Sequence, residues 1–235
     1  MSAISHSAAE GGAYPARPAA VVGRYLITGQ FHFLPASERD IDRAKQAVGR
    51  ILDTYAFARG RHTLVISTLG DVVQMLPLKL AMVDRNLIVC TADASPYEFG
   101  RIRSMIGRFD IAAVFGVTAA VLDGLIASGT DPAALFKGKV VWARPDAYAR
   151  LQNAADIELR RWIELGPALA LECRCGDGAH IDSLEWQLDR ADDGELLVSS
   201  RLDRALSFVR MATGIRATLT RDLCGCGHPG PRVRP

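Results

Sequence analysis

The chain has 235 residues, 49% of them apolar, and a formal net charge of +2. The near-neutral charge and scattered arginines argue against a nucleic-acid partner, and no apolar run reaches the roughly 18 residues of a membrane helix. The length suits one large domain, or one domain with a small appendage. The first 20 residues are small and Gly- and Pro-rich, unlike a signal peptide or transit sequence. We therefore expect a disordered lead-in over residues 1–20 and a cytoplasmic protein.

Ordered structure is expected from about Val21, and strands then alternate with helices up to residue 145. Ser37 is expected to cap a first helix that runs through residues 41–57, with acidic residues in its first turn. Pro77 predicts a kink or a late start in the next helix. The expected helices after the first are 71–84, 95–109 and 117–129, and the expected strands are 61–67, 86–92, 110–116 and 139–145. This alternation predicts an α/β fold with a mostly parallel sheet covered on both faces.

After residue 165 the pattern changes to short strands separated by Gly or Asp turns. The expected strands are 169–173, 180–190, 194–200, 206–212 and 216–220. They predict an antiparallel β unit. We therefore divide the chain into a lead-in (1–20), an α/β domain (21–160) and a β subdomain (161–235).

Cysteines and histidines gather in two short clusters near the end of the chain. The first contains Cys173, Cys175 and His180, and the second contains Cys224, Cys226 and His228. In a chain without a secretory signal, such clusters favour a zinc site over disulfides or free thiols. His228, in a Pro- and Gly-rich loop, is expected at the surface.

The segment TGQFHFLPASERDI (residues 28–41) resembles the phosphate loop and following helix of the phenylacetate–coenzyme A ligase family, within the acyl-adenylate-forming superfamily. Thr28, Gly29, Pro35, Ser37 and Asp40 fit that pattern. However, bulky residues (Tyr25, Leu26 and Ile27) stand where the family has small ones, and His32 replaces its lysine. Bulky side chains keep backbone N–H groups away from a triphosphate. We therefore predict that ATP is not a cofactor.

Two further segments resemble the same family. ELGPALALEC places Glu164 on the family's acidic magnesium ligand, and GELLVSSRLDRALSFVRMATGI matches a nucleotide-binding segment through Arg210, Thr213 and Gly214. Ile215 replaces the aspartate that would bind the ribose hydroxyls. The resemblance covers most of residues 25–235, and the family's small C-terminal domain and the first part of its large domain are not matched. It implies a truncated, degenerate homologue: a partial large domain with a zinc-clamped antiparallel β subdomain at the C-terminus.

The resemblance also implies the zinc ligands. The family's ligand pattern falls on Cys175, His180, Cys224 and Cys226, with Cys173 as the alternative to Cys175. Three thiolates and one imidazole form a closed tetrahedral site without a position for water, which implies structural Zn²⁺.

A ligand pocket is implied beside the strand and helix at residues 115–125, which resemble the family's acyl pocket. Gly116 and Thr118 would lie at the carboxyl end of a parallel strand, where open α/β sheets bind ligands, together with Glu164. The catalytic residues are unknown, and the candidates are Glu164, Thr118 and His32. The simpler roles are a salt bridge from Glu164 to Arg160 or Arg161 and a solvent-facing position for His32.

Three functional hypotheses follow. The first is a non-adenylating homologue of an aryl- or acyl-CoA ligase that binds an acyl or aryl group, presented as a thioester on coenzyme A or an acyl-carrier protein, and serves a biosynthetic pathway as an accessory protein. The second is an ATP-independent enzyme that transfers, hydrolyses or cyclises such a thioester. The third is one part of a split adenylating ligase. Because loss of the small domain would expose apolar surface, we expect a homodimer or a dedicated protein partner.

Overall fold

The structure is a computed structural model that describes residues 18–228 and 230–234. Residues 1–17 of the expected lead-in lie outside the described residues. The first element, β1 (Val21–Ile27), begins at the residue where ordered structure was expected.

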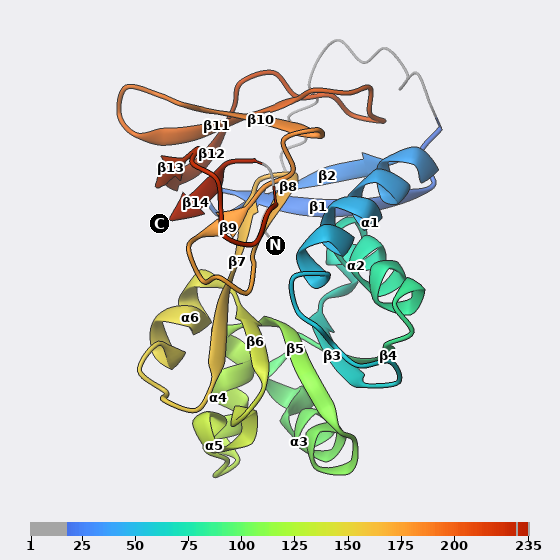
Figure 1. Ribbon diagram of the computed structural model, residues 1–235, viewed down its shortest axis with the longest axis vertical. Coiled ribbons are helices and arrows are strands. Elements are labelled where there is room, and N and C mark those ends of the chain that lie inside the picture. Colours follow the sequence, from blue (N-terminus) through green and yellow to red (C-terminus); the bar gives the residue numbers. More distant parts are fainter. Residues whose placement is uncertain (1–17, 229, 235) are drawn as a thin grey trace, which may run out of the picture.

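A nine-stranded sheet forms the centre of the described chain and is parallel at one end and antiparallel at the other (Figure 1). Its parallel strands lie in the spatial order β4 (Ile88–Asp93), β3 (His62–Ser67), β5 (Ile111–Val117), β6 (Val140–Ala143) and β7 (Glu158–Leu165). Its antiparallel strands continue as β8 (Ala168–Glu172), β9 (Ala179–His180), β14 (Arg232–Arg234) and β13 (Thr218–Thr220). The prediction of a mixed α/β fold with a mostly parallel sheet in its first part is confirmed.

Helices cover both faces of the parallel part, because buried apolar side chains alternate along its strands. One face packs on α1 (Glu38–Leu52) and α2 (Val72–Asp84). The other packs on α3 (Phe99–Arg108), α4 (Ala119–Ala127), α5 (Pro132–Phe136) and α6 (Pro145–Leu151). Pro77 lies inside α2, which starts after a short 3-10 turn, η1 (Leu69–Asp71). A second 3-10 turn, η2 (Pro96–Glu98), precedes α3.

Two smaller antiparallel sheets pack beside the antiparallel end. One is the hairpin of β1 and β2 (Gln30–Ala36), and the other contains β10 (Trp186–Arg190), β11 (Glu195–Ser200) and β12 (Met211–Arg216). Their inner faces share one core with β7, β8 and β14.

Several expected elements differ from the structure. The expected strand 180–190 is two strands, because β9 ends at His180 and β10 begins at Trp186. The expected strand 206–212 is wrong, since β12 begins only at Met211. Strand β7 was not predicted, and the domain boundary placed at residue 160/161 falls inside it. The division into two domains stays a prediction.

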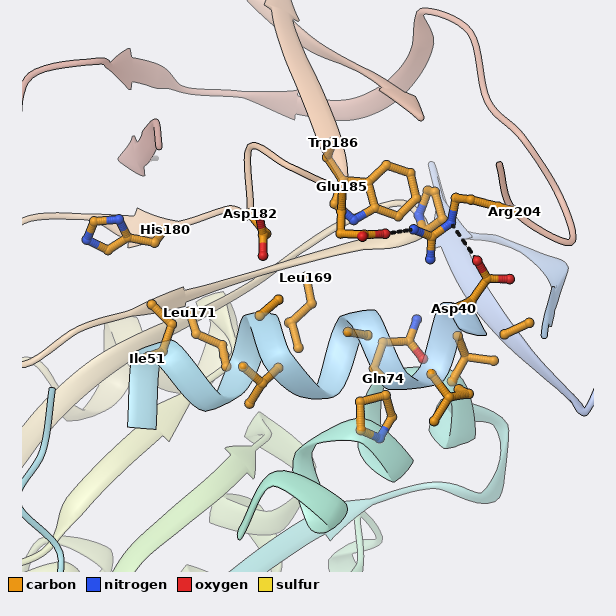
Figure 2. A pocket seen from close by; sticks show the side chains of 18 of the residues that line it. Asp40, Ile51, Gln74, Leu169, Leu171, His180, Asp182, Glu185, Trp186 and Arg204 are labelled. Carbon is orange, nitrogen blue, oxygen red and sulfur yellow. Dashed lines mark hydrogen bonds and ion pairs between the residues drawn. The ribbon is translucent and has the colours of Figure 1, made fainter. Parts of the chain in front are cut away.

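Four charged side chains, two buried and two largely buried, tie α1 to the segments around the three-stranded sheet. Figure 2 shows three of them, Asp40, Glu185 and Arg204. Arg43 Nη2 donates to Asp40 Oδ1 at 2.9 Å, and Arg43 Nε lies 2.8 Å from Glu185 Oε1. Arg204 Nη1 donates to Glu185 Oε2 at 2.7 Å, and its guanidinium lies 4.2 Å from the centre of the Trp186 ring. Asp40 and Glu185 are only 2% and 5% exposed. We call Asp40, Arg43, Glu185 and Arg204 the ion quartet.

Asp40 also closes the cap of α1, as the acidic first turn predicts. It accepts from the Ser37 backbone N–H at 2.9 Å and the Ala205 backbone N–H at 3.0 Å. Burial opposes ionisation of Asp40, but these backbone bonds, the Ser37 hydroxyl and the charge of Arg204 hold its pKa below the ordinary value. The carboxylate is therefore charged at neutral pH.

Candidate functional site

A pocket of about 250 Å³ lies at the carboxyl edge of the parallel strands, under the β1–β2 hairpin. After β3, the chain adds β4 on one side of β3 and then β5 on the other. Such a reversal of strand order is where open α/β sheets bind ligands. The lining residues are Arg24, Tyr25, Leu26, Phe31, Thr68, Asp71, Ala94, Thr118, Ala120, Arg144, Asp146 and Glu164. We call this the edge pocket.

Charged side chains line part of the edge pocket. Arg144 lies between two carboxylates, with Nη2 2.9 Å from Asp71 Oδ2 and Nη1 2.9 Å from Glu164 Oε1. Trp162 Nε1 donates to the same Glu164 oxygen at 3.0 Å. Because both carboxylates are bonded to one guanidinium, their oxygens are held in fixed positions at the pocket wall.

Arg24 supplies a second guanidinium from β1. Its Nη2 donates to Thr68 Oγ1 at 3.2 Å, and its charge lies 4.1 Å from the centre of the Phe31 ring. The Nε atoms of Arg24 and Arg144 are buried and have no hydrogen-bond partner among the described residues. The two guanidinium groups are the positively charged hydrogen-bond donors of the pocket lining.

The structure brings two of the three predicted pocket residues together. Thr118 and Glu164 both line the edge pocket, while Gly116 lies in β5 and does not. Thr118 caps α4, its hydroxyl accepting from the Val121 backbone N–H at 3.3 Å. The expected salt bridge from Glu164 to Arg160 or Arg161 is wrong: Arg160 pairs with Glu158 and Arg161 with Glu172.

Gly116 has a backbone role. Its φ is +80°, and a Cβ atom there would lie 2.4 Å from the carbonyl oxygen of Ile66 on β3. Any residue with a side chain could therefore occupy this position only if the backbone of β3 or β5 shifted.

We expect Gly116→Ala to destabilise the protein by about 2–3 kcal/mol, because it adds a left-handed non-glycine residue and a backbone clash. Chemical denaturation followed by circular dichroism measures the change. Gly107→Ala, on an exposed part of α3 with open space around the added methyl group, is the matched control and should be neutral or slightly stabilising. Equal stability of the two variants would show that neither the positive φ nor the contact with β3 requires glycine at position 116.

His32 lies outside the edge pocket. It is exposed on β2, opposite Tyr25, and the two rings stack with centroids 5.3 Å apart. The simpler expectation, a solvent-facing strand residue, agrees with this position.

Arg24, Asp71 and Arg144 were missed in the sequence. Arg144 lay inside the expected strand 139–145, whereas in the structure it directly follows β6 and so reaches the carboxyl edge. Arg24 and Asp71 reach the pocket through contacts across more than 40 residues, which no local pattern reveals.

The second candidate site is a compact group of Cys173, His180, Cys224 and Cys226, whose ligand atoms all lie within 4.8 Å of one another. Cys173 directly follows β8 and His180 ends β9, while Cys224 and Cys226 lie between β13 and β14. The two sulfurs of Cys173 and Cys224 are 3.7 Å apart, and Cys226 Sγ is 3.5 Å from His180 Nε2. This group can hold a metal ion.

Cys175, named first in the expected ligand set, is exposed and lies outside this group, whereas the alternative, Cys173, is fully buried within it. The expectation of a surface position for His228 is wrong. Its side chain is buried, and its ring centroid lies 4.7 Å from that of His180.

Without an ion, the four groups differ in how easily they ionise. Burial raises the pKa of Cys173, and burial together with the charges of His228 and Arg232 lowers the pKa of His180 to about 4. Burial opposes ionisation of Cys224, but hydrogen bonds from the Cys226 backbone and neighbouring side chains lower its pKa to about 7. Cys224 is therefore the thiol that ionises first, and a cation between the sulfurs would favour ionisation of the others.

No helix among residues 18–228 and 230–234 is long and apolar enough to cross a membrane. No protein-family model matches the chain, and a search of curated proteins finds no match.

Solved structures do resemble the fold. A 2-hydroxyisobutyryl-CoA ligase in complex with 2-HIB-AMP and CoA matches with a TM-score of 0.65 and 16% identity, over 92% of this chain and 52% of the ligase. The same ligase in its postadenylation state matches with a TM-score of 0.68 and 15% identity, over 92% of this chain and 50% of the ligase. The Klebsiella oxytoca NpsA N-terminal subdomain, in complex with 3-hydroxyanthranilyl-AMSN, matches with a TM-score of 0.58 and 10% identity, over 92% of this chain and 64% of the subdomain. The chain thus has the fold of part of an acyl-CoA ligase and spans about half the length of the first of these.

Proposed function

We propose that the protein is a non-adenylating homologue of the phenylacetate–CoA ligase family that binds an acyl or aryl thioester in the edge pocket. It would serve a cytoplasmic biosynthetic pathway as an accessory protein. The observation that carries the proposal is the edge pocket itself, which combines apolar walls with two guanidinium groups at the strand reversal. Such a combination is typical of small-ligand sites.

The hairpin turn supports the absence of adenylation. β1 and β2 pair without interruption up to Ile27 and Gln30, so only Thr28 and Gly29 form the turn. Both have positive φ, as a tight two-residue hairpin requires. A phosphate loop needs a wider run of free backbone N–H groups.

Ile215 supports the same conclusion. It lies in β12 and packs against the core shared by the smaller sheets. An aliphatic side chain offers no acceptor for ribose hydroxyls.

The pocket chemistry suits a thioester carbonyl. Tyr25, Leu26 and Phe31 offer apolar contact to an acyl or aryl group, and the guanidinium groups of Arg24 and Arg144 offer hydrogen-bond donors to its oxygen. The ordered carboxylates of Asp71 and Glu164 offset the two positive charges, which favours an uncharged acyl group.

Titration calorimetry of the purified, metal-loaded chain tests the proposal. We expect binding of benzoyl-CoA or isobutyryl-CoA in the micromolar range, weaker binding of coenzyme A alone, and no binding of ATP with Mg²⁺. Arg24→Gln should weaken thioester binding about tenfold, equivalent to one charge-assisted hydrogen bond. The exposed Arg216→Gln is the control and should bind like the unchanged protein.

Each alternative has its own outcome. Thioester consumption without ATP would favour an ATP-independent enzyme. Micromolar ATP binding would contradict the proposal and favour a split ligase, whose pyrophosphate release should then require a second protein.

We further propose that the Cys/His group binds structural Zn²⁺ through Cys173, His180, Cys224 and Cys226. In a tetrahedral zinc site, two thiolates lie about 3.8 Å apart, and a thiolate lies about 3.5 Å from an imidazole nitrogen. The sulfur–sulfur distance of 3.7 Å and the sulfur–nitrogen distance of 3.5 Å fit these values. When bound, the ion would compensate the thiolates and join the β8–β9 loop to the β13–β14 loop.

We also propose that the protein is a homodimer. Beyond the rim of the edge pocket, the same face of the β1–β2 hairpin is apolar and open, with Phe33 and Val22 82% and 56% exposed. Apolar faces of this kind are usually covered, and an apolar patch is complementary to a second copy of itself.

Light scattering over a concentration series should therefore give the mass of a dimer, and Phe33→Glu should give the monomer. The exposed Leu223→Glu, far from the hairpin in sequence, should leave the mass unchanged. A monodisperse monomer at high concentration would contradict the dimer.

A further inference from the structure

A second cavity, of about 390 Å³, lies beside the edge pocket, where β3 and β4 end. Its lining comes from η1 and α2 on one side, from the last residues of β3 and β4, and from η2 and α3 on the other side. It shares Thr68 with the edge pocket but none of the charged residues that line that pocket. Cavities of this size at the carboxyl ends of parallel strands are typical of small-ligand sites. We call it the β4 pocket.

One wall of the β4 pocket is apolar and belongs to α2. Val72, Met75 and Leu76 line it, and their spacing of three and four residues places them along one side of the helix. Leu69, at the start of η1, extends this wall and is 94% exposed. An alkyl group bound there would remove apolar surface from water.

Four charged side chains line the β4 pocket, and two of them compensate each other. Arg101 Nε lies 3.8 Å from Glu98 Oε2, three residues earlier in the chain. The side chains of Lys79 and Asp93 form no ion pair or hydrogen bond with any residue among 18–228 and 230–234. The pocket therefore presents one positive and one negative charge that no described side chain compensates.

The fold places these two charges on facing walls of the β4 pocket. Val89, Thr91 and Asp93 share one face of β4, because side chains alternate along a strand. Val89 packs on the core that α1 and α2 share with the sheet, so Thr91 and Asp93 lie on the α2 side of β4. Lys79 follows Leu76 on the same side of α2. Side chains of a helix lean towards its N-terminus, which for α2 lies at the carboxyl ends of the strands. An ammonium and a carboxylate thus line one cavity without bonding to each other.

We propose that the β4 pocket binds an amino acid in its zwitterionic form. The ligand carboxylate accepts from the Lys79 ammonium, the ligand ammonium donates to the Asp93 carboxylate, and an aliphatic side chain lies against Met75 and Leu76. A zwitterion supplies both missing partners at once, whereas a simple anion would meet the charge of Asp93 and a simple cation would meet that of Lys79. The inference does not depend on the proposed function, since no charged residue of the edge pocket takes part.

Titration of the ¹⁵N-labelled chain with leucine, followed by amide chemical shifts, tests this proposal. Two molecules with the same aliphatic group are the matched control ligands: 4-methylpentanoate lacks the ammonium, and 3-methylbutylammonium lacks the carboxylate. We expect saturable, millimolar binding of leucine with shifts concentrated in residues 67–79 and 91–101. Each control ligand should bind about tenfold more weakly, equivalent to one charge-assisted hydrogen bond.

Two substitutions test the two charges separately. Asp93→Asn should lower the affinity for leucine about tenfold without weakening the binding of 4-methylpentanoate, and Lys79→Met should lower it about tenfold without weakening the binding of 3-methylbutylammonium. Asp192→Asn and Lys137→Met make the same changes at exposed positions outside the pocket and should bind leucine like the unchanged protein. Circular dichroism verifies that all four variants are folded.

The proposal is wrong if leucine gives no saturable shifts. It is also wrong if leucine binds no more tightly than the two control ligands, which would show an apolar cavity that does not recognise charge. Unchanged leucine affinity in both Asp93→Asn and Lys79→Met would overturn it as well. Failure of thioester binding at the edge pocket would leave each of these outcomes unaffected.

Discussion

Replacing Cys224 by serine is expected to remove zinc and to lower the melting temperature by about 10–20 °C, equivalent to about 5 kcal/mol for a chain of this size. Most residues of the two joined loops are exposed or half-buried, so the loops bury little apolar surface of their own. Without the ion, the buried thiols and His180 would remain in a low-dielectric region without compensation.

Cys173→Ser and Cys175→Ser form a matched pair that tests the choice of ligand. Only the first should lose zinc, measured by mass spectrometry of the metal content, and only the first should lose thermal stability. Loss of zinc in Cys175→Ser with retention in Cys173→Ser would assign the ligand to the exposed cysteine instead. Retention of full stability after metal removal by a chelator would contradict a structural role.

Glu185→Gln is expected to destabilise the protein by about 3–5 kcal/mol, because it leaves the largely buried Arg43 and Arg204 beside a single carboxylate. The corresponding fall in melting temperature is about 6–20 °C. Asp193→Asn breaks the exposed pair with Arg216 and should cost less than about 1 kcal/mol.

A double variant distinguishes the free-energy cost of leaving one charge unpaired from the contribution of the intact ion quartet to stability. Glu185→Leu combined with Arg204→Leu removes one charge of each sign, and part of the lost stability should return. Urea denaturation measures all of these variants. A loss for Glu185→Gln no greater than for Asp193→Asn would show that the quartet is solvated in solution.

The parallel half of the fold could be predicted because each strand and helix there carries its own local pattern. Strand β7 could not, because Arg160, Arg161 and Glu164 make it look polar. These side chains pair with Glu158, Glu172 and Arg144, respectively. Glu172 and Arg144 lie outside β7, so the sequence of the strand alone does not reveal these two pairs.

The candidate sites divide in the same way. The clustering of cysteines predicted a metal group, but the spacing allowed either Cys173 or Cys175. Strand β8 ends at Glu172, and Cys173, which follows it, is fully buried. The spacing of cysteines along the sequence does not reveal where this strand ends. Thr118 and Glu164 follow from the family resemblance, whereas Arg24 joins the pocket only through the hairpin.

The order of strands in the antiparallel half has a consequence for synthesis on the ribosome. β14, near the end of the chain, lies between β9 and β13, and Val233 is fully buried there. While the protein is being made, β9 therefore presents an unpaired edge for more than 40 residues of translation. The parallel half can form early, but the antiparallel half closes only after residues 232–234 leave the exit tunnel. During that interval, a chaperone or the strand edge of another nascent chain could pair with β9.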